Sequence, residues 1–410
     1  MLFKDGKFIS KKNAKKNVPN IDIHAIFQDS KGQTWIGTKE GFSKGKDLNH
    51  LNFSGMTNES IITFYELKNG NICLGTQNGA FIVNPEGKLL KKLDRKAGFF
   101  GKEVRSFYED RKGKLWIGSY NGGLYCYHKN KFTSINLMSN CKLPLDIFTL
   151  AKDKNSMIYF TGNLGLNAVS EEKLNEFYSG KIDYLIPLYY GEETGIYNSE
   201  FNGGFQNNFL KDGDNFYFPT IEGINLLKTN QRLIKKQKPF FKSIHINNKL
   251  SNFKNNKFKA ETYTIVIEFN AANYNSKNNV YYQHKLSKNG QKNHPWSSLQ
   301  KSNSITFDLL GAGKYSLSVR ALDGYNDTKP QIIHYDFEIQ PYFYQSRIFY
   351  IITALILIIF TWYVVKLRIR ILQKKQKLNF QINNKIVELK LEAIQSKMNP
   401  HFIFNTLNNT

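Results

Sequence analysis

Cysteine is scarce in this sequence, and no group of residues has the spacing of a metal site. The only cysteines among 410 residues, Cys73, Cys126 and Cys141, are irregularly spaced, which argues against a disulfide framework or a zinc site. The eight histidines are scattered too, so we predict no metal ligand set. The three cysteines are expected to be core residues.

Acidic residues are also few: 33 Asp and Glu face 57 Lys and Arg, and the formal net charge is +24. Nucleic-acid binding would explain this charge if the basic residues formed a patch or belonged to a recognised module. The lysines are instead spread over the whole chain without a module motif, and we predict no nucleic-acid partner. The 32 Phe and 23 Tyr indicate that most of the chain folds.

Long apolar runs are missing except at residues 348–365, IFYIITALILIIFTWYVV, which contain no charged residue. As a helix these 18 residues would span about 27 Å, close to the thickness of a membrane core. Aromatic residues lie at both ends, at 342–344 and 362–363, as at the two interfaces of a bilayer. We predict a transmembrane helix over 348–365.

The charges that flank this helix predict its orientation. Residues 366–377 hold six Lys or Arg and no acid, whereas residues 331–347 hold only Arg347 beside two acids. Basic flanks stay in the cytoplasm, so we expect residues 366–410 inside and residues 1–347 outside the membrane. The first residues show no apolar export signal, so we expect that either Met1 is not the true start or the chain was cut from a longer one.

The part that precedes the membrane helix contains an internal repeat. Five segments align: DSKGQTWIGTKEGFS, LKNGNICLGTQNGAF, DRKGKLWIGSYNGGL, DKNSMIYFTGNLGLN and DGDNFYFPTIEGINL. One column holds Trp35, Cys73, Trp116, Tyr159 and Tyr217, which lie 38, 43, 43 and 58 residues apart. A second column, six residues later, is glycine in every copy: Gly41, Gly79, Gly122, Gly165 and Gly223.

Short strands that recur with a period near 40 are typical of propeller blades, in which each blade packs against the next. We therefore expect these aromatic residues and glycines to be structural. The longest gap contains an insertion, IPLYYGEETGIYNSEFNGGFQ, which could reach a ligand or only seal the ring. Between about 240 and 340, five segments alternate at period two, which indicates a β-sandwich of immunoglobulin type.

The segment that follows the membrane helix reads as one long helix. No Pro or Gly interrupts residues 366–399, and Leu378, Ile382, Ile386, Leu389 and Ala393 form a single apolar seam. Such a seam can pair with a second copy as a coiled coil, although the six basic residues would also suit a helix that lies on anionic lipid.

The chain ends in SKMNPHFIFNTLNNT, where Pro400 interrupts helix hydrogen bonding. His401 is a nitrogen nucleophile that can act near neutral pH, and Asn405 lies one helical turn later, able to orient the imidazole. On spacing alone, a solvated helix residue would be the simpler interpretation of His401.

LEAIQSKMNPHFIFNTLNN closely resembles the phosphoacceptor motif of LytS-type sensor histidine kinases, with an unbroken match from Asn399 through Asn405. Lys397 stands where Gln is more usual. The blades resemble two-component regulator propeller repeats, and Pro219 departs from a usual Gly, which leads us to expect an irregular turn there. Tyr274, Tyr282, Trp296 and Tyr315 resemble the Y_Y_Y (triple-tyrosine) immunoglobulin-like domain.

The resemblance implies a mainly β protein, truncated at both ends. Its parts are β-propeller blades (1–238, about five), an immunoglobulin-like β-sandwich (239–341), the transmembrane helix (348–365), a cytoplasmic coiled-coil dimerisation helix (366–398) and the start of the phosphoacceptor region (399–410). It also implies a homodimeric sensor histidine kinase of a bacterial inner membrane. His401 would be the phosphoacceptor and Asn405 its orienting residue.

In such a kinase the extracytoplasmic ligand is unknown, with a glycan among the candidates, and the partner is a response regulator. ATP with Mg would bind to a further C-terminal domain, so this chain alone would not be a competent kinase. The alternative is a membrane-tethered propeller that binds a glycan or a protein without kinase activity. A propeller hydrolase would need convergent carboxylates or a nucleophile with a base, and the blades contain no such motif.

Overall fold

The computed structural model describes residues 2–4, 7–9, 18, 20, 22–47, 50–53, 59–229, 238–262, 264–271, 280–291, 294–324 and 330–397. Clustering of contacts divides the chain into two compact units. The first consists of residues 1–255, 264–308 and 314–337, and the second of residues 256–263, 309–313 and 338–410. Each is described by itself.

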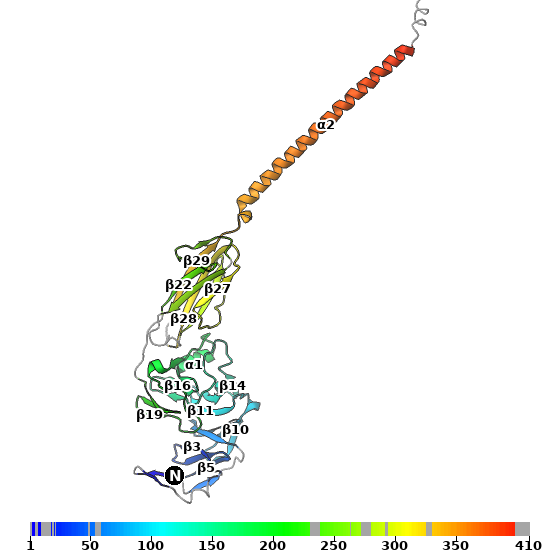
Figure 1. The fold of residues 1–410 in the computed structure, drawn as a ribbon. Coiled ribbons are helices and arrows are strands. Elements are labelled where there is room, and N and C mark those ends of the chain that lie inside the picture. Colours follow the sequence, from blue (N-terminus) through cyan, green and yellow to red (C-terminus); the bar gives the residue numbers. More distant parts are fainter. Residues whose placement is uncertain are drawn as a thin grey trace, which may run out of the picture. The chain divides into compact units, whose positions relative to one another are not determined.

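Five successive antiparallel sheets make up most of the first unit, and we call them blades one to five (Figure 1). Their strands are β3 (Ile23–Gln28), β4 (Thr34–Thr38), β5 (Gly41–Gly45) and β6 (Leu51–Phe53); β7 (Ile61–Glu66), β8 (Ile72–Thr76), β9 (Gly79–Val83) and β10 (Leu89–Leu93); β11 (Glu103–Glu109), β12 (Leu115–Tyr120), β13 (Gly123–His128) and β14 (Lys131–Ser134); β15 (Ala151–Lys152), β16 (Met157–Gly162), β17 (Gly165–Ser170) and β18 (Leu188–Tyr190); and β19 (Leu210–Asp212), β20 (Asn215–Thr220) and β21 (Gly223–Lys228). A hairpin of β1 (Leu2–Lys4) and β2 (Lys7–Ile9) precedes them. The short helices are η2 (Arg95–Ala97), α1 (Glu171–Tyr178) and η3 (Glu192–Thr194).

Each blade packs its apolar face against the next blade, which confirms propeller-like repeats. Trp35 of blade one lies in a cluster with Phe64 and Leu74 of blade two, and Trp116 of blade three lies with Phe160 of blade four. Both tryptophans are fully buried. Burial of one large aromatic side chain stabilises a fold by about 1.5–3 kcal/mol, so the aromatic column of the repeat is structural at Trp35 and Trp116, as expected, whereas Tyr217 is only half-buried. Cys73 and Cys126 are also buried in these interfaces.

In four copies of the repeat the glycine of the second column is the residue that follows the tight turn, but in the third copy, at Gly122, it is not. Gly41, Gly79, Gly165 and Gly223 each begin a strand with a positive φ. In blade three the residue in that place is Gly123, not Gly122, because the hairpin pairs Ser119 with Gly123 and contains one residue more. Sequence spacing could not show the longer turn because a second glycine follows the first.

An irregular turn at Pro219 is also not observed. Strand β20 pairs with β21 through Pro219 without a register shift. At the equivalent positions of other blades, a Cβ on Gly37 would lie 2.9 Å from Ile61, and one on Gly75 would lie 2.6 Å from Val104. Glycine is therefore needed where the first strand of the next blade approaches, and no strand that the structure describes approaches Pro219 in this way.

Two more four-stranded sheets follow, and we call the part of them in the first unit, residues 239–255, 264–308 and 314–337, the double-sheet region. Their orders are β23-β22-β25-β27 and β24-β29-β28-β26. Phe269 and Tyr282, from different sheets, meet with ring centroids 5.0 Å apart. The strands are β22 (Pro239–Ile246), β23 (Lys249–Ser251), β24 (Lys257–Phe258), β25 (Thr264–Ala271), β26 (Tyr281–Lys288), β27 (Ser304–Asp308), β28 (Gly313–Leu322) and β29 (Ile332–Ile339). Tyr274 lies outside the described residues.

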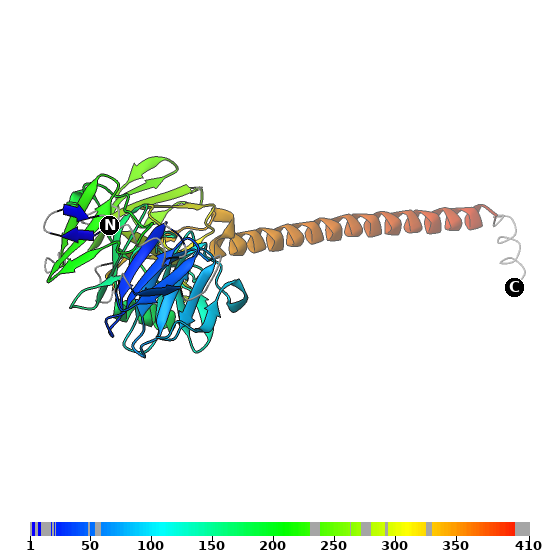
Figure 2. The ribbon, with the colours of Figure 1, turned by 90° about the horizontal axis from the view of Figure 1, so that it is seen from below.

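The second unit contains η5 (Phe343–Gln345) and one continuous helix, α2 (Arg347–Lys397), of 51 residues (Figure 2). Among the described residues it is the one helix long and apolar enough to cross a membrane. At its start Tyr342 and Tyr344 stack at 5.2 Å, and further along Lys366 lies 4.6 Å from the ring of Trp362. The sequence prediction of an unbroken helix over residues 366–398 is confirmed as far as Lys397, where the described residues end.

Candidate functional site

The residues predicted to carry chemistry, His401 and Asn405, lie outside the described residues, since these end at Lys397. Their roles remain predictions. The structure does place a pocket elsewhere, at helix α1 of blade four, together with two groups of contacts that join distant parts of the first unit.

Helix α1 is fixed to blade four by a cap and an apolar face. Ser170 accepts a hydrogen bond from the backbone N–H of Lys173 at 3.1 Å, which satisfies one of the free donors of the first turn. Leu174 and Phe177 are buried in the cluster that also contains Trp116 of blade three. The helix therefore lies across two neighbouring blades, and its polar face is held over their turns.

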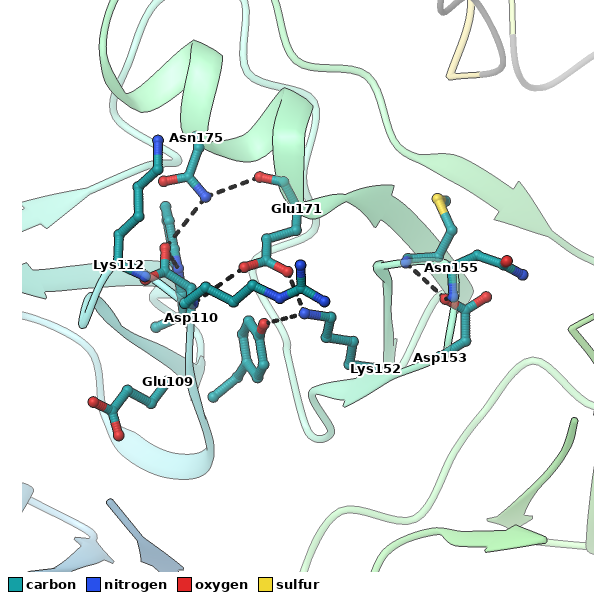
Figure 3. Close-up of polar contacts among 12 residues, drawn as sticks. Glu109, Asp110, Lys112, Lys152, Asp153, Asn155, Glu171 and Asn175 are labelled. Carbon is teal, nitrogen blue, oxygen red and sulfur yellow. Dashed lines mark hydrogen bonds and ion pairs between the residues drawn. The ribbon is translucent and has the colours of Figure 1, made fainter. Parts of the chain in front are cut away.

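Glu171 at the start of α1 is the centre of a buried polar network (Figure 3). Its carboxylate pairs with Lys152, whose ammonium also donates to the hydroxyl of Tyr108 at 2.9 Å. Burial acts to raise the pKa of Glu171, but bonds from Lys152, Tyr108 and the backbone of Arg111 prevail and hold that pKa below its ordinary value. Burial raises the pKa of Tyr108, so the phenol stays protonated.

Asp110 organises the turn that faces α1. Its carboxylate accepts from the backbone N–H groups of Lys112 at 2.8 Å and Lys114 at 2.9 Å, and from the indole N–H of Trp116 at 3.3 Å. The side-chain amide of Asn175 donates to the same carboxylate at 3.2 Å. The turn is therefore fixed both to the blade core and to the helix, as Figure 3 shows.

Between this turn and α1 lies an open pocket of about 520 Å³, a size typical of small-molecule sites. The lining side chains are those of Arg111, Lys112, Lys114, Ser156, Glu171, Glu172, Asn175, Glu176, Ser179 and Lys181. Lys112 extends beside Asn175 of the helix, whereas Glu109 points away from it (Figure 3). The lining side chains end in polar groups of both charge signs, most of the surface that they expose to the pocket is apolar, and they come from blades three and four.

The predicted insertion, residues 186–206, ends in a segment that together with residues 207–208 contacts the blades at or just before their first strands. The side chain of Gln206 bonds both the N–H and the carbonyl of Phe64, at 2.8 and 3.0 Å, and its backbone N–H donates to His24 at 3.0 Å. Arg105 donates to the carbonyl of Gly203, and Asn208 donates to that of Phe148 at 2.5 Å. Of the two roles considered for the insertion, these contacts favour sealing.

The chain that leaves α1 contacts the double-sheet region within the same unit. Asp183 pairs with Arg320 of β28 at 3.3 Å, and Ile186 packs against Leu299 and Leu322. Arg320 also donates to Gln283 at 2.6 Å, and its guanidinium lies 4.4 Å from the ring of Trp296. On helix α1 itself, the ammonium of Lys173 donates to the carbonyl of Gly324 at 3.3 Å. Helix α1 thus borders the pocket on one face and this junction on the other.

Sequence reasoning missed the pocket, because it depends on which blade turns α1 covers. The available signals were modest: three basic residues within the RKGK stretch 111–114, and the acidic EEKLNEFY stretch 171–178 inside a long repeat gap. Neither stretch alone indicates a site.

Comparison with known proteins bears on the repeats. Residues 17–40 and 98–121 match the family model described as two component regulator propeller. These segments include the first hairpins of blades one and three. No curated protein matches the chain.

Solved structures with a similar course of the chain include extracellular domains from B. thetaiotaomicron. One, described as from a hybrid two component system, is 19% identical over 83% of this chain and 52% of its own, with a TM-score of 0.47. Another, described as from a one component system, is 18% identical over 78% of this chain and 43% of its own, with a TM-score of 0.36. PorZ, a surface component of the type-IX secretion system of Porphyromonas gingivalis, is 15% identical over 82% of this chain and 48% of its own, with a TM-score of 0.39. The chain spans about half the length of these structures.

Proposed function

We propose that this chain is the sensing and phosphoacceptor part of a LytS-type transmembrane sensor histidine kinase. The observation that carries the proposal is the unbroken Asn399–Asn405 block, NPHFIFN, directly after the long helix α2. The match of two blade segments to the two component regulator propeller model supports the same assignment. The uncharged stretch of α2, followed by six basic residues, supports a single membrane crossing with residues 366–410 in the cytoplasm.

In this proposal residues 1–238 sense an extracytoplasmic ligand, and residues 239–341, an immunoglobulin-like sandwich of the Y_Y_Y type, pass the change to residues 348–365 in the inner membrane. Residues 366–398 pair in a homodimer and present His401. The imidazole of His401 takes the γ-phosphoryl group of ATP, with ADP as leaving group, and passes it to an aspartate of a response regulator. Asn405 orients the imidazole. No residue of this chain is assigned to ATP or Mg, which a separate ATP-binding domain would hold.

Phosphotransfer in trans tests the proposal. The full chain, in detergent or nanodiscs, is mixed with the ATP-binding domain of a LytS-type kinase and labelled ATP, beside His401→Gln and the control His294→Gln. We expect acid-labile label on the wild type and the control, and none on His401→Gln. Equal labelling of both variants, or no label with a partner domain that is active on its own kinase, would contradict the proposal and favour a tethered binding protein.

A further inference from the structure

Three cations line the pocket beside α1. Arg111, Lys112 and Lys114 all line it, and within the described residues none of them makes an ion pair. Lys114 is only 8% exposed. Its ammonium donates to the side-chain oxygen of Asn175 and lies 4.6 Å from the ring of Tyr178. The same Asn175 amide also donates to the fully buried carboxylate of Asp110, so Lys114 already has an anion near it. Arg111 and Lys112 are exposed at the pocket, and two neighbouring cations at one pocket favour an anionic ligand.

The carboxylates of the pocket do not supply that anion. Glu171 is already paired with Lys152, and Glu176 with Lys181. Glu172 is exposed on the first turn of α1 and makes no ion pair within the described part of the chain. The pocket therefore offers a cationic side, at residues 111–114, opposite one carboxylate that can accept hydrogen bonds. Ser156 and Ser179 add hydroxyl groups to the lining.

We propose that this pocket binds a small organic acid that also carries hydroxyl groups. The carboxylates of the ligand meet the cations of residues 111–114, and its hydroxyl groups donate to Glu172 and the serines. An uncharged polyol would leave the cations unmatched, and a simple dicarboxylate would leave Glu172 without donors. The volume of about 520 Å³ admits an acid of four to six carbons with bound water.

The ligand of this pocket would be the signal that the proposed sensor detects, and in that respect the inference rests on the proposed function. The pocket is connected to the double-sheet region through α1. Lys173 of this helix donates to the carbonyl of Gly324, and Asp183 in the chain after the helix pairs with Arg320. Binding itself needs neither ATP nor His401. A failure here would leave the phosphotransfer result untouched, and the reverse also holds.

Calorimetric titration of the full chain in detergent, at low salt, tests the site with three matched four-carbon probes. Tartrate has carboxylates and hydroxyls, succinate has carboxylates alone, and threitol has hydroxyls alone. We expect tartrate to bind most tightly, succinate at least about threefold more weakly, and threitol not at all. The double variant Arg111→Gln/Lys112→Gln should weaken tartrate binding about tenfold or more, since it removes the charge-assisted hydrogen bonds to the carboxylates of the ligand.

The matched control is Lys102→Gln/Lys131→Gln, which removes the same charge from exposed positions of the same blade outside the pocket. It should bind tartrate like the wild type. Glu172→Gln should reduce the preference for tartrate over succinate. Equal loss in both double variants would show attraction to surface charge in general, and no heat with tartrate at about 10 mM would show no site; either result overturns the proposal, as does equal binding of succinate and tartrate.

Discussion

A buried aspartate closes the first turn of blades one, three and four. Asp29 accepts from the backbone N–H groups of Lys31 and Gln33, at 3.1 and 2.8 Å, and from the indole of Trp35 at 2.8 Å. Asp110 and Asp153 make the same turn contacts and bond Trp116 and Tyr159, both at 3.3 Å. The spacing of six residues from Asp to the aromatic residue in the repeat therefore has a hydrogen-bonding cause as well as a packing cause.

Asp29→Ala should destabilise blade one by about 1–3 kcal/mol, because it leaves buried N–H donors without an acceptor. Thermal unfolding of the full chain in detergent measures the effect. The control Asp212→Ala, at an exposed position of β19, should stay within about 0.5 kcal/mol of the wild type. Equal shifts for the two variants would mean that the turn bonds add no stability beyond packing.

Glu171 makes the pocket sensitive to acid. Its pKa in the fold lies below the ordinary value of 4.5, so its interactions stabilise the folded state fully above pH 4.5 and are lost as the pH falls through the lower, folded pKa. Glu171→Gln should therefore reduce the melting temperature at pH 7, and the difference from wild type should shrink below about pH 4. A difference that stays constant down to pH 3 would exclude the ionised carboxylate as its cause; Glu40→Gln, at an exposed position, serves as control.

At this scale the sequence predicted packing better than polar contacts. The column of Trp35, Cys73 and Trp116 was recognisable because large or apolar residues recur at a fixed place, and the structure buries all three. Gly122 was assigned in place of Gly123 since strand pairing, not spacing, defines the turn. Glu171 and Lys114 could not be recognised, because the groups that contact them lie far away in the sequence: Tyr108 and Arg111 of blade three contact Glu171, and Asn175 in the repeat gap contacts Lys114.

Among the elements, α1 and the chain that follows it connect blade four with the double-sheet region. The Asp183–Arg320 pair is supported by Gln283 and Trp296 on the side of Arg320, whose side chain is 11% exposed, whereas that of Asp183 is 64% exposed. Exposed ion pairs contribute at most about 1 kcal/mol. The pair therefore adds orientation to a contact whose stability comes from Ile186, Leu299 and Leu322.

A double-mutant cycle of Asp183→Asn and Arg320→Gln, read by thermal unfolding in detergent, should give a coupling of about 0.5–1 kcal/mol. The coupling should fall in high salt, because Asp183 is largely exposed to solvent. A matched cycle on Lys154 and Asp214, which pair at 2.7 Å between blades four and five, reports an ion pair within the blades. No coupling between Asp183 and Arg320 would remove this pair from any route between the pocket and the double-sheet region.

For the whole molecule, the prediction from sequence was strongest where a pattern is long. The run of uncharged residues predicted a helix over 348–365 and the uninterrupted stretch predicted a second helix over 366–398; the structure has helix in both places, as one continuous α2 from Arg347 to Lys397. The proposal for the dimer adds that the seam at residues 378–393 faces a second copy. Within one chain no described side chain of α2 is buried, and in the seam Ile382 and Ile386 are 48% and 44% exposed, so exposure does not distinguish the seam from the other faces, and the seam is open to a second copy or to lipid.

Cysteine cross-linking in membranes distinguishes these two partners. Ile386→Cys lies on the seam, and Glu388→Cys, two residues on, points to nearly the opposite side of the helix. If α2 pairs as a coiled coil, oxidation should give a disulfide-linked dimer for Ile386→Cys and little for Glu388→Cys. The native thiols should add little background, because burial raises the pKa of Cys126 to about 12 and that of Cys141 to about 11. Similar cross-linking at both positions, or at neither, would contradict a fixed pair and leave a helix that lies on lipid through its basic residues.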